Sequence, residues 1–186
     1  TLFPYTTLFR SARDREYLNL MEPEVIEDAL KLEVAAGAQC AVTATEDITR
    51  ARLAHLRMDS EADELARAAL AIANNVKPQH VLVEIDPCGL PLDASSKASL
   101  KENRDQYADA ARAFESSGLA FDAFFLNGFM SVPDLKCALM GIAKVSDRPV
   151  FASVTVAADG KLPELSGMPA QSERSESSGS SGKPLA

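Results

Sequence analysis

Four short apolar segments alternate with longer amphipathic segments along this chain, and each apolar segment ends in polar or turn-forming residues. The apolar segments cover residues 40–45, 80–85, 121–126 and 150–156. Strands that alternate with helices are typical of a parallel β-sheet built from βαβ units. Because ligands bind at the carboxyl ends of the strands in such folds, the residues that follow these segments are the first candidates for a functional site.

The amphipathic segments predict helices over residues 23–36, 60–74, 100–117 and 133–145. Pro23 suits the first turn of the first helix, Gly37 ends it, and Ser60 is the expected N-cap of the second helix. Residues 48–57 are expected to form a short helix or ordered loop, and residues 87–99 a long loop. The strands recur at intervals of about 40 and then about 30 residues, as in a (β/α)8 TIM barrel cut near its middle. The predicted fold class is therefore α/β, a partial TIM barrel.

The two ends of the chain differ in composition from the segment between them. Residues 1–11 read TLFPYTTLFRS and resemble the translation of a sequencing-adapter oligonucleotide, so residues 1–12 are expected to be an artefactual or disordered leader. Residues 166–186 are rich in Ser and Gly, which predicts a disordered tail. A truncated or shifted reading frame would produce the same tail. The folded domain is expected over residues 13–165.

Charge and cysteine content exclude several classes of protein. The 186 residues carry a net charge of −8, with 19 Lys and Arg against 27 Asp and Glu. Nucleic acids and anionic membranes require clustered cations, so neither is expected as a partner. The longest apolar runs are far shorter than the roughly 20 residues that a membrane helix needs. Three cysteines without CxxC spacing favour reduced thiols in a cytoplasmic protein over a disulfide framework.

The order and spacing of several short motifs resemble the homocysteine S-methyltransferase family. The motifs are Asn19-Leu20, Pro23-Glu24, Ala36-Gly37-Ala38, Thr43-Ala44-Thr45, Arg50 with Leu53, Asp86-Pro87-Cys88-Gly89, and residues 122–129, 135–139 and 149–162. The resemblance covers nearly all of residues 19–162 and implies the N-terminal half of the family's barrel. It also implies that the full-length parent transfers a methyl group to the thiol of homocysteine, or of a related compound, and forms methionine. The sequence leaves open whether the donor is a methylated corrinoid, betaine or S-methylmethionine.

The chain departs from the family pattern at several positions. Ala44 stands where the family has Asn, Glu46 where it has an aromatic residue, and Asn127 where it has Glu. The family binds zinc through three cysteines whose positions would lie beyond the end of this chain. Zinc is therefore expected in the full-length parent, whereas no metal or cofactor is expected here and the chain alone is expected to be inactive. A degenerate, non-catalytic barrel that binds a ligand or a partner is the alternative.

Polar residues at the carboxyl ends of the predicted strands are the candidate substrate-binding residues, namely Thr43, Thr45, Asp86 and Asn127. Glu46 and Asp47 are equally well placed. The resemblance implies that such groups contact the amino group of the substrate or the methyl donor. Helix capping and loop solvation would explain the Asp and Asn residues as well, and β-propensity would explain the Thr residues. No catalytic residue is identified.

Cysteines and histidines are interpreted as structural. Cys40 starts a predicted strand, Cys88 follows one and Cys137 lies inside a predicted helix, so these thiols are not expected to share a metal ion. His55 and His80 lack the spacing of a ligand pair.

Overall fold

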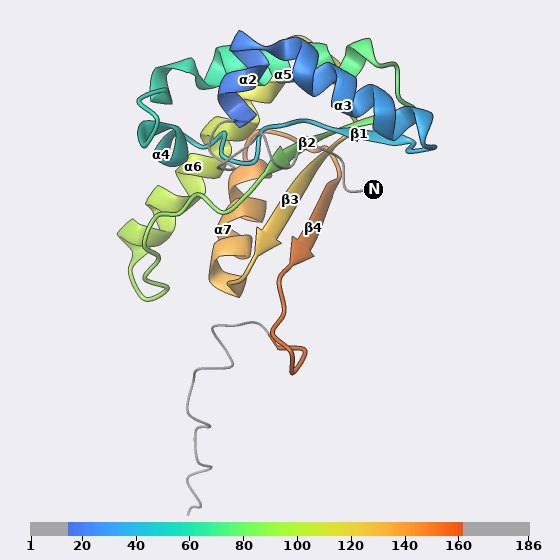
Figure 1. Ribbon diagram of the computed structural model, residues 1–186. Coiled ribbons are helices and arrows are strands. Elements are labelled where there is room, and N and C mark those ends of the chain that lie inside the picture. Colours follow the sequence, from blue (N-terminus) through green and yellow to red (C-terminus); the bar gives the residue numbers. More distant parts are fainter. Residues whose placement is uncertain (1–14, 162–186) are drawn as a thin grey trace, which may run out of the picture.

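The computed structural model describes residues 15–161, and its centre is a four-stranded parallel sheet (Figure 1). The strands lie side by side in the order of the sequence and are β1 (Cys40–Val42), β2 (His80–Ile85), β3 (Ala123–Phe129) and β4 (Val150–Val154). Each neighbouring pair is parallel, so the carboxyl ends of all four strands meet at one edge. The predicted α/β fold of alternating strands and helices is confirmed.

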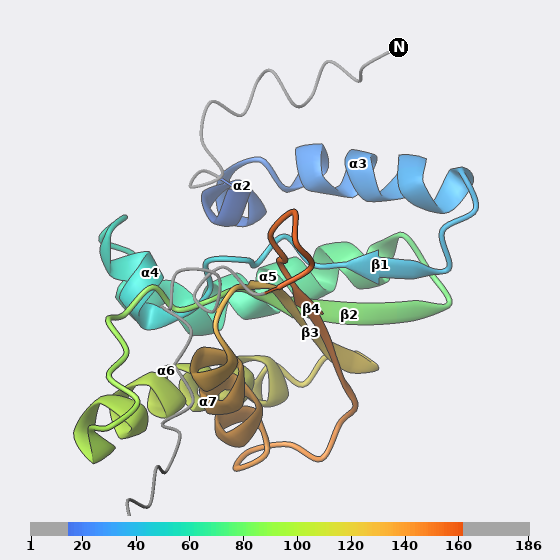
Figure 2. The ribbon, with the colours of Figure 1, turned by 90° about the horizontal axis from the view of Figure 1, so that it is seen from below.

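Helices fill the intervals between the strands. They are α2 (Arg15–Met21), α3 (Pro23–Ala35), α4 (Arg50–Ala54), α5 (Ala62–Asn75), α6 (Lys97–Ser116) and α7 (Val132–Ile142), with a short 3₁₀ turn at Asp59–Glu61. Helix α3 contacts β1, helices α5 and α6 contact β2, and α7 contacts β3. Figure 2 shows α3 beside β1, with α6 and α7 toward the β3 end of the sheet. No helix among residues 15–161 is both long enough and apolar enough to cross a membrane.

Three of the predicted strands have wrong boundaries, and the fourth strand ends at Val154 rather than at residue 156. The first strand ends at Val42 rather than at residue 45, because the side chains of Thr43 and Thr45 continue the bonding to β2 in place of a regular ladder. The third strand begins at Ala123 and runs to Phe129, two residues later than predicted at its start and three residues later at its end. Phe121 lies before this strand and instead packs under the guanidinium of Arg148, 4.1 Å from the ring centre.

Predictions for two helix starts are also corrected. Ser60 is not an N-cap, because it lies inside the 3₁₀ turn and α5 begins after Glu61. Helix α6 begins at Lys97, and the Ser96 hydroxyl accepts a hydrogen bond from the Ser99 amide as its N-cap, which shortens the predicted loop. Helix α2 was not predicted at all, because its seven residues are too few to show a clear period.

The two faces of the sheet differ in what covers them. Val83, Ile85 and Phe124 are fully buried in the core beneath the helices, because alternate residues of a strand point to the same side. On the opposite face Leu82 and Phe151 line a hollow of about 490 Å³, and the side chain of Phe151 is 57 % exposed. This second face, called the open face below, is where the strands present their remaining side chains.

Helices α6 and α7 pack closely against each other at Gly141. A Cβ atom at this position would lie 2.5 Å from the backbone oxygen of Arg104 and 2.9 Å from the Cβ of Tyr107. The absence of a side chain at Gly141 is therefore what permits this helix pair to pack.

Gly141→Ala is expected to lower the free energy of unfolding by about 1–3 kcal/mol, because overpacking outweighs the gain in helix propensity of about 1 kcal/mol. Urea denaturation monitored by circular dichroism measures the change. Gly118→Ala is the control, because a Cβ there meets nothing within 4 Å and only its positive φ of 72° is strained. Equal or greater stability of the Gly141 variant would contradict the packing argument.

Candidate functional site

A row of hydrogen-bonded polar side chains crosses β2, β3 and β4 on the open face, near the carboxyl ends of the strands. The Asn127 Nδ2 atom donates to Glu84 Oε1 over 2.7 Å, and the Ser153 hydroxyl donates to Asn127 Oδ1 over 2.6 Å. The backbone amide of Gly128 donates to the Ser153 hydroxyl over 3.0 Å. Both ends of the Asn127 amide are therefore occupied, and its orientation is determined by its neighbours.

The strand register explains why this row forms. Glu84 pairs with Phe125 across the β2–β3 ladder, and Asn127 lies two residues farther along β3 on the same face. A diagonal neighbour at this separation is within reach of a Glu side chain. Glu84 thus brings a carboxylate beside Asn127 from the adjacent strand.

Asp86 lies directly beyond the end of β2 and next to this row. Its Oδ2 atom is 3.9 Å from the position that a Cβ of Gly128 would occupy, and its Oδ1 atom is buried with no hydrogen-bond partner among the described residues. Burial, together with the nearby carboxylates of Glu84 and Glu46, raises the pKa of Asp86 to about 7. Asp86 is therefore partly protonated near neutral pH.

Glu46 faces Asp86 and Glu84 from the loop after β1. Its Oε1 atom forms an ion pair with Arg15 Nη1 at 2.7 Å, whereas its Oε2 atom is buried and unpartnered among the described residues. Burial also raises the pKa of Glu84, and the charge of Glu46 contributes to that increase. The charge of Glu46 thus raises the pKa of both Glu84 and Asp86.

Thr43 and Thr45 are buried and bind the backbone of β2. Thr45 donates its hydroxyl hydrogen to the carbonyl of Glu84 over 2.8 Å, and the amide of Glu84 donates to Thr43 Oγ1 over 3.1 Å. The two hydroxyl oxygens lie 2.7 Å apart, so Thr43 donates to Thr45. Both hydroxyls thus hold Glu84 in place, and substrate contact by these threonines stays a prediction.

Asp86 lies directly after β2, as predicted, whereas Asn127 lies within β3 rather than after it. Contact of either residue with a substrate stays a prediction. Sequence reasoning missed Glu84. The available signal was a lone acidic residue in the apolar strand HVLVEI, because its neighbours Val83 and Ile85 belong to the opposite face. The half-buried carboxylate of Asp47 points elsewhere and lies 3.5 Å from Arg52 Nε.

The three cysteines lie apart from this row. Cys40 is exposed at the start of β1, whereas Cys88 and Cys137 are buried and donate to Asn103 Oδ1 and to the Leu100 carbonyl, respectively. Burial raises the pKa of both buried thiols, which favours the protonated form over the thiolate that metals bind. Within residues 15–161 no three His, Cys, Asp or Glu side chains are arranged to hold a metal ion, so these residues do not fit zinc. Zinc in a longer parent stays a prediction.

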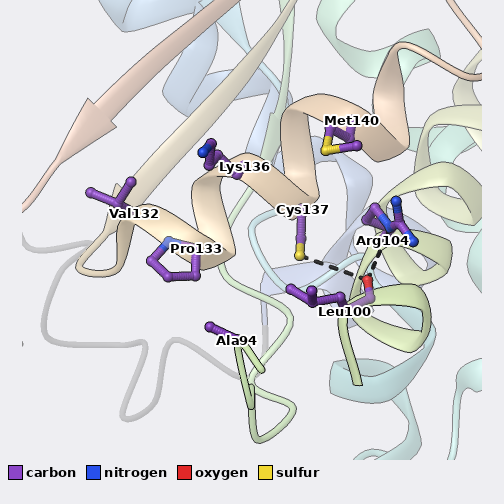
Figure 3. Close-up of a pocket in the computed structure, with 8 residues that line it drawn as sticks. All are labelled: Ala94, Leu100, Arg104, Val132, Pro133, Lys136, Cys137 and Met140. Carbon is purple, nitrogen blue, oxygen red and sulfur yellow. Dashed lines mark hydrogen bonds between the residues drawn. The ribbon is translucent and has the colours of Figure 1, made fainter. Parts of the chain in front are cut away.

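The two histidines and a second cavity lie outside the row as well. His80 sits at the opposite end of β2, where its Nδ1 atom is 3.5 Å from Asp122, and His55 follows α4. A cavity of about 370 Å³ lies in the helix layer, and Figure 3 shows the residues that line it. Residues of α6 and α7 line most of it, among them Leu100, Arg104, Lys136 and Met140. This cavity contains no carboxylate and is separate from the open face.

Helix α2 is anchored beside the site by buried polar side chains. Glu16 Oε1 accepts a hydrogen bond from the Asp47 amide over 2.8 Å, and Asn19 Nδ2 donates to the Ala44 carbonyl over 2.8 Å. Glu16 Oε2 is buried and unpartnered among the described residues, and burial raises the pKa of Glu16 to about 8. Glu16 therefore stays protonated in the folded chain at pH values where it ionises in the unfolded chain.

This difference predicts that stability falls as pH rises from about 4.5 to about 8, because only the unfolded state loses the Glu16 proton in that range. Glu16→Gln keeps an acceptor for the Asp47 amide and removes the titration. The variant should therefore lose less stability between about pH 5 and about pH 8 than the wild type does, by on the order of 4 kcal/mol. Urea denaturation at both pH values measures this, with the exposed Glu64→Gln as control. Parallel pH profiles of the Glu16 variant and the wild type would refute the assignment.

The model of the homocysteine S-methyltransferase family matches residues 5–177. The fold is similar to that of the homocysteine methyltransferase MmuM from Escherichia coli in its oxidized form, with a TM-score of 0.67 and 16 % identity over 82 % of this chain and 58 % of that chain. The metallated form has a TM-score of 0.65 and 16 % identity, over 82 % of this chain and 59 % of that chain. Among curated protein sequences none matches.

The chain thus spans less than two thirds of the length of these solved structures. Their similarity concerns the fold, and it confirms that the parallel sheet with its helices is part of a TIM barrel. The family match extends over most of the 186 residues. The chain belongs to the homocysteine S-methyltransferase family.

Proposed function

We propose that the chain is part of an enzyme that transfers a methyl group to the thiol of homocysteine and so forms methionine. The observation that carries this proposal is the family match over residues 5–177. The reaction requires that the methyl group leaves its donor, that a bond forms between this carbon and the sulfur, and that the thiol proton departs. Both substrates must therefore be held side by side.

The polar row at the carboxyl ends of the strands supports this proposal. Homocysteine carries an ammonium group, a carboxylate and a thiol, and the row offers carboxyl and amide groups to its polar end. Glu84, Asn127 and Asp86 lie within one small region of the open face, where a barrel of this type binds its ligands. No described residue is assigned to the formation of the thiolate.

Two further features belong to the proposal. A methylated corrinoid, betaine and S-methylmethionine are all candidate donors, because the described residues do not distinguish them. A cytoplasmic location is supported by the three unpaired thiols.

The decisive experiment takes the longest reading frame that contains this sequence in the source DNA. The purified product should form methionine from L-homocysteine and one of the three donors, as measured by mass spectrometry with an isotopically labelled methyl group. A folded product that binds homocysteine without turnover would support the non-catalytic binding module instead. Failure both to bind and to turn over would contradict both functions.

The 186-residue chain itself is expected to show no tight one-to-one zinc site. The described residues bring no three ligands together, and a closed zinc site needs four. Competition with a chromophoric chelator measures the affinity and the stoichiometry. Cys40→Ser is the control that removes binding to the exposed thiol. Tight binding of one zinc ion per chain would overturn this expectation.

A further inference from the structure

We propose that the cavity between α6 and α7 binds a small monocarboxylate with an unbranched apolar chain. The carboxylate of this ligand lies between Arg104 and Lys136, and its chain lies against Leu100, Pro133 and Met140. The cavity belongs to the helix layer and is separate from the open face, so the inference does not depend on methyl transfer. It adds a second ligand site to the chain.

The cavity has the size and the lining of a site for a small ligand. Its volume is about 370 Å³, near the lower end of the roughly 300–1,000 Å³ that ligand pockets occupy. Leu100 lines it from α6, Pro133 and Met140 line it from α7, and Ala94 belongs to the loop that precedes α6 (Figure 3). Three segments of the chain thus surround one space, and most of its lining is apolar.

Part of the apolar wall is exposed to solvent. Met140 is 52 % exposed, although α7 packs closely against α6 at Gly141. Methionine side chains are flexible and fill irregular apolar gaps, which suits them to contact with an alkyl chain. Such a chain would remove apolar surface from water, and each buried CH₂ group would strengthen binding about fourfold.

Two cationic side chains line the same cavity from different helices, Arg104 from α6 and Lys136 from α7 (Figure 3). Arg104 Nε donates a hydrogen bond to the Leu100 carbonyl over 3.1 Å, which holds the guanidinium at the edge of the cavity. The N–H groups on its two Nη atoms are further donors. Within residues 15–161 neither cation forms an ion pair, so a ligand can supply the counter-charge.

The neighbouring carboxylates of α6 and α7 are engaged elsewhere. Lys101 Nζ donates to Asp105 Oδ2 over 2.6 Å, and Lys144 Nζ donates to Asp105 Oδ1 over 3.2 Å. The Tyr107 hydroxyl donates to Asp134 Oδ1 over 2.6 Å. Neither carboxylate is part of the cavity lining, which leaves the local charge around the cavity positive.

These features select a carboxylate on an apolar chain. A guanidinium matches a planar carboxylate with two parallel N–H donors, and a lysine adds a compact charge. A singly charged carboxylate costs less to desolvate beside apolar walls than a doubly charged phosphate does. The chain as a whole carries a net charge of −8 and repels anions, so only the local charge of this cavity favours an anion over a cation.

The test uses the 186-residue chain and follows its methionine methyl groups by ¹H–¹³C NMR. Octanoate is the probe, and it should shift the Met140 resonance with saturation while Met21 and Met58, which lie outside the cavity, stay unchanged. Hexanoate should bind about tenfold more weakly, because it buries two fewer CH₂ groups. 1-Octanol, which has the same chain without the charge, should bind at least about threefold more weakly than octanoate, and octylammonium more weakly still.

Several results would refute the proposal. They are an unchanged Met140 resonance, equal binding of hexanoate and octanoate, and binding of 1-octanol or octylammonium as tight as that of octanoate. The last result would reveal a purely apolar surface without selection for an anion.

Arg104→Gln should weaken octanoate binding by at least about threefold and leave 1-octanol binding unchanged. Gln keeps an N–H donor for the Leu100 carbonyl, and the exposed Arg67→Gln on α5 is the matched control. Lys136→Gln, at an exposed position, should act in the same direction and carries the comparison if the Arg104 variant does not fold. Equal losses for octanoate and 1-octanol, or no loss for octanoate, would contradict recognition of the carboxylate by these cations.

Discussion

The parallel register of β2, β3 and β4 is the constraint on which the site depends. A parallel sheet places all carboxyl ends at one edge, and the two-residue period places alternate side chains on one face. Glu84, Asn127 and Ser153 satisfy both conditions and therefore meet as one hydrogen-bonded row. A shift of one residue between β2 and β3 would turn Asn127 toward the helices and break the row.

The balance of charge around this row is unusual for a folded interior. Glu16, Glu46 and Asp86 are all buried at one or more oxygen atoms, and within residues 15–161 only Arg15 forms an ion pair with any of the three. The protein tolerates this because the pKa values of Glu16 and Asp86 rise to about 8 and about 7, so that protons neutralise part of the charge. Such a concentration of raised pKa values marks a functional site better than a structural one.

Much of the candidate site was visible in the sequence once the strands were located. Asp86 and Asn127 follow the predicted apolar segments directly, and that position alone made them candidates. Glu84 was missed because it lies inside a strand. The sequence does not show to which face of the sheet a strand residue points, and that face decides whether its carboxylate is buried in the core or can bind a ligand. Thr43 and Thr45 were found by position, but their bonds to the backbone of Glu84 depend on how β1 diverges from β2 after Val42.

The sequence by itself determined the order and type of the main elements, because strand and helix periods, prolines and glycines are local properties of the chain. It also determined the family, through motifs whose order is preserved. Only the tertiary structure decided the open face, the hydrogen bond between Asn127 and Glu84, and the unpaired oxygens of Glu46 and Asp86. These features join residues about 40 positions apart, and they arise from the strand register and from burial, which no local pattern encodes.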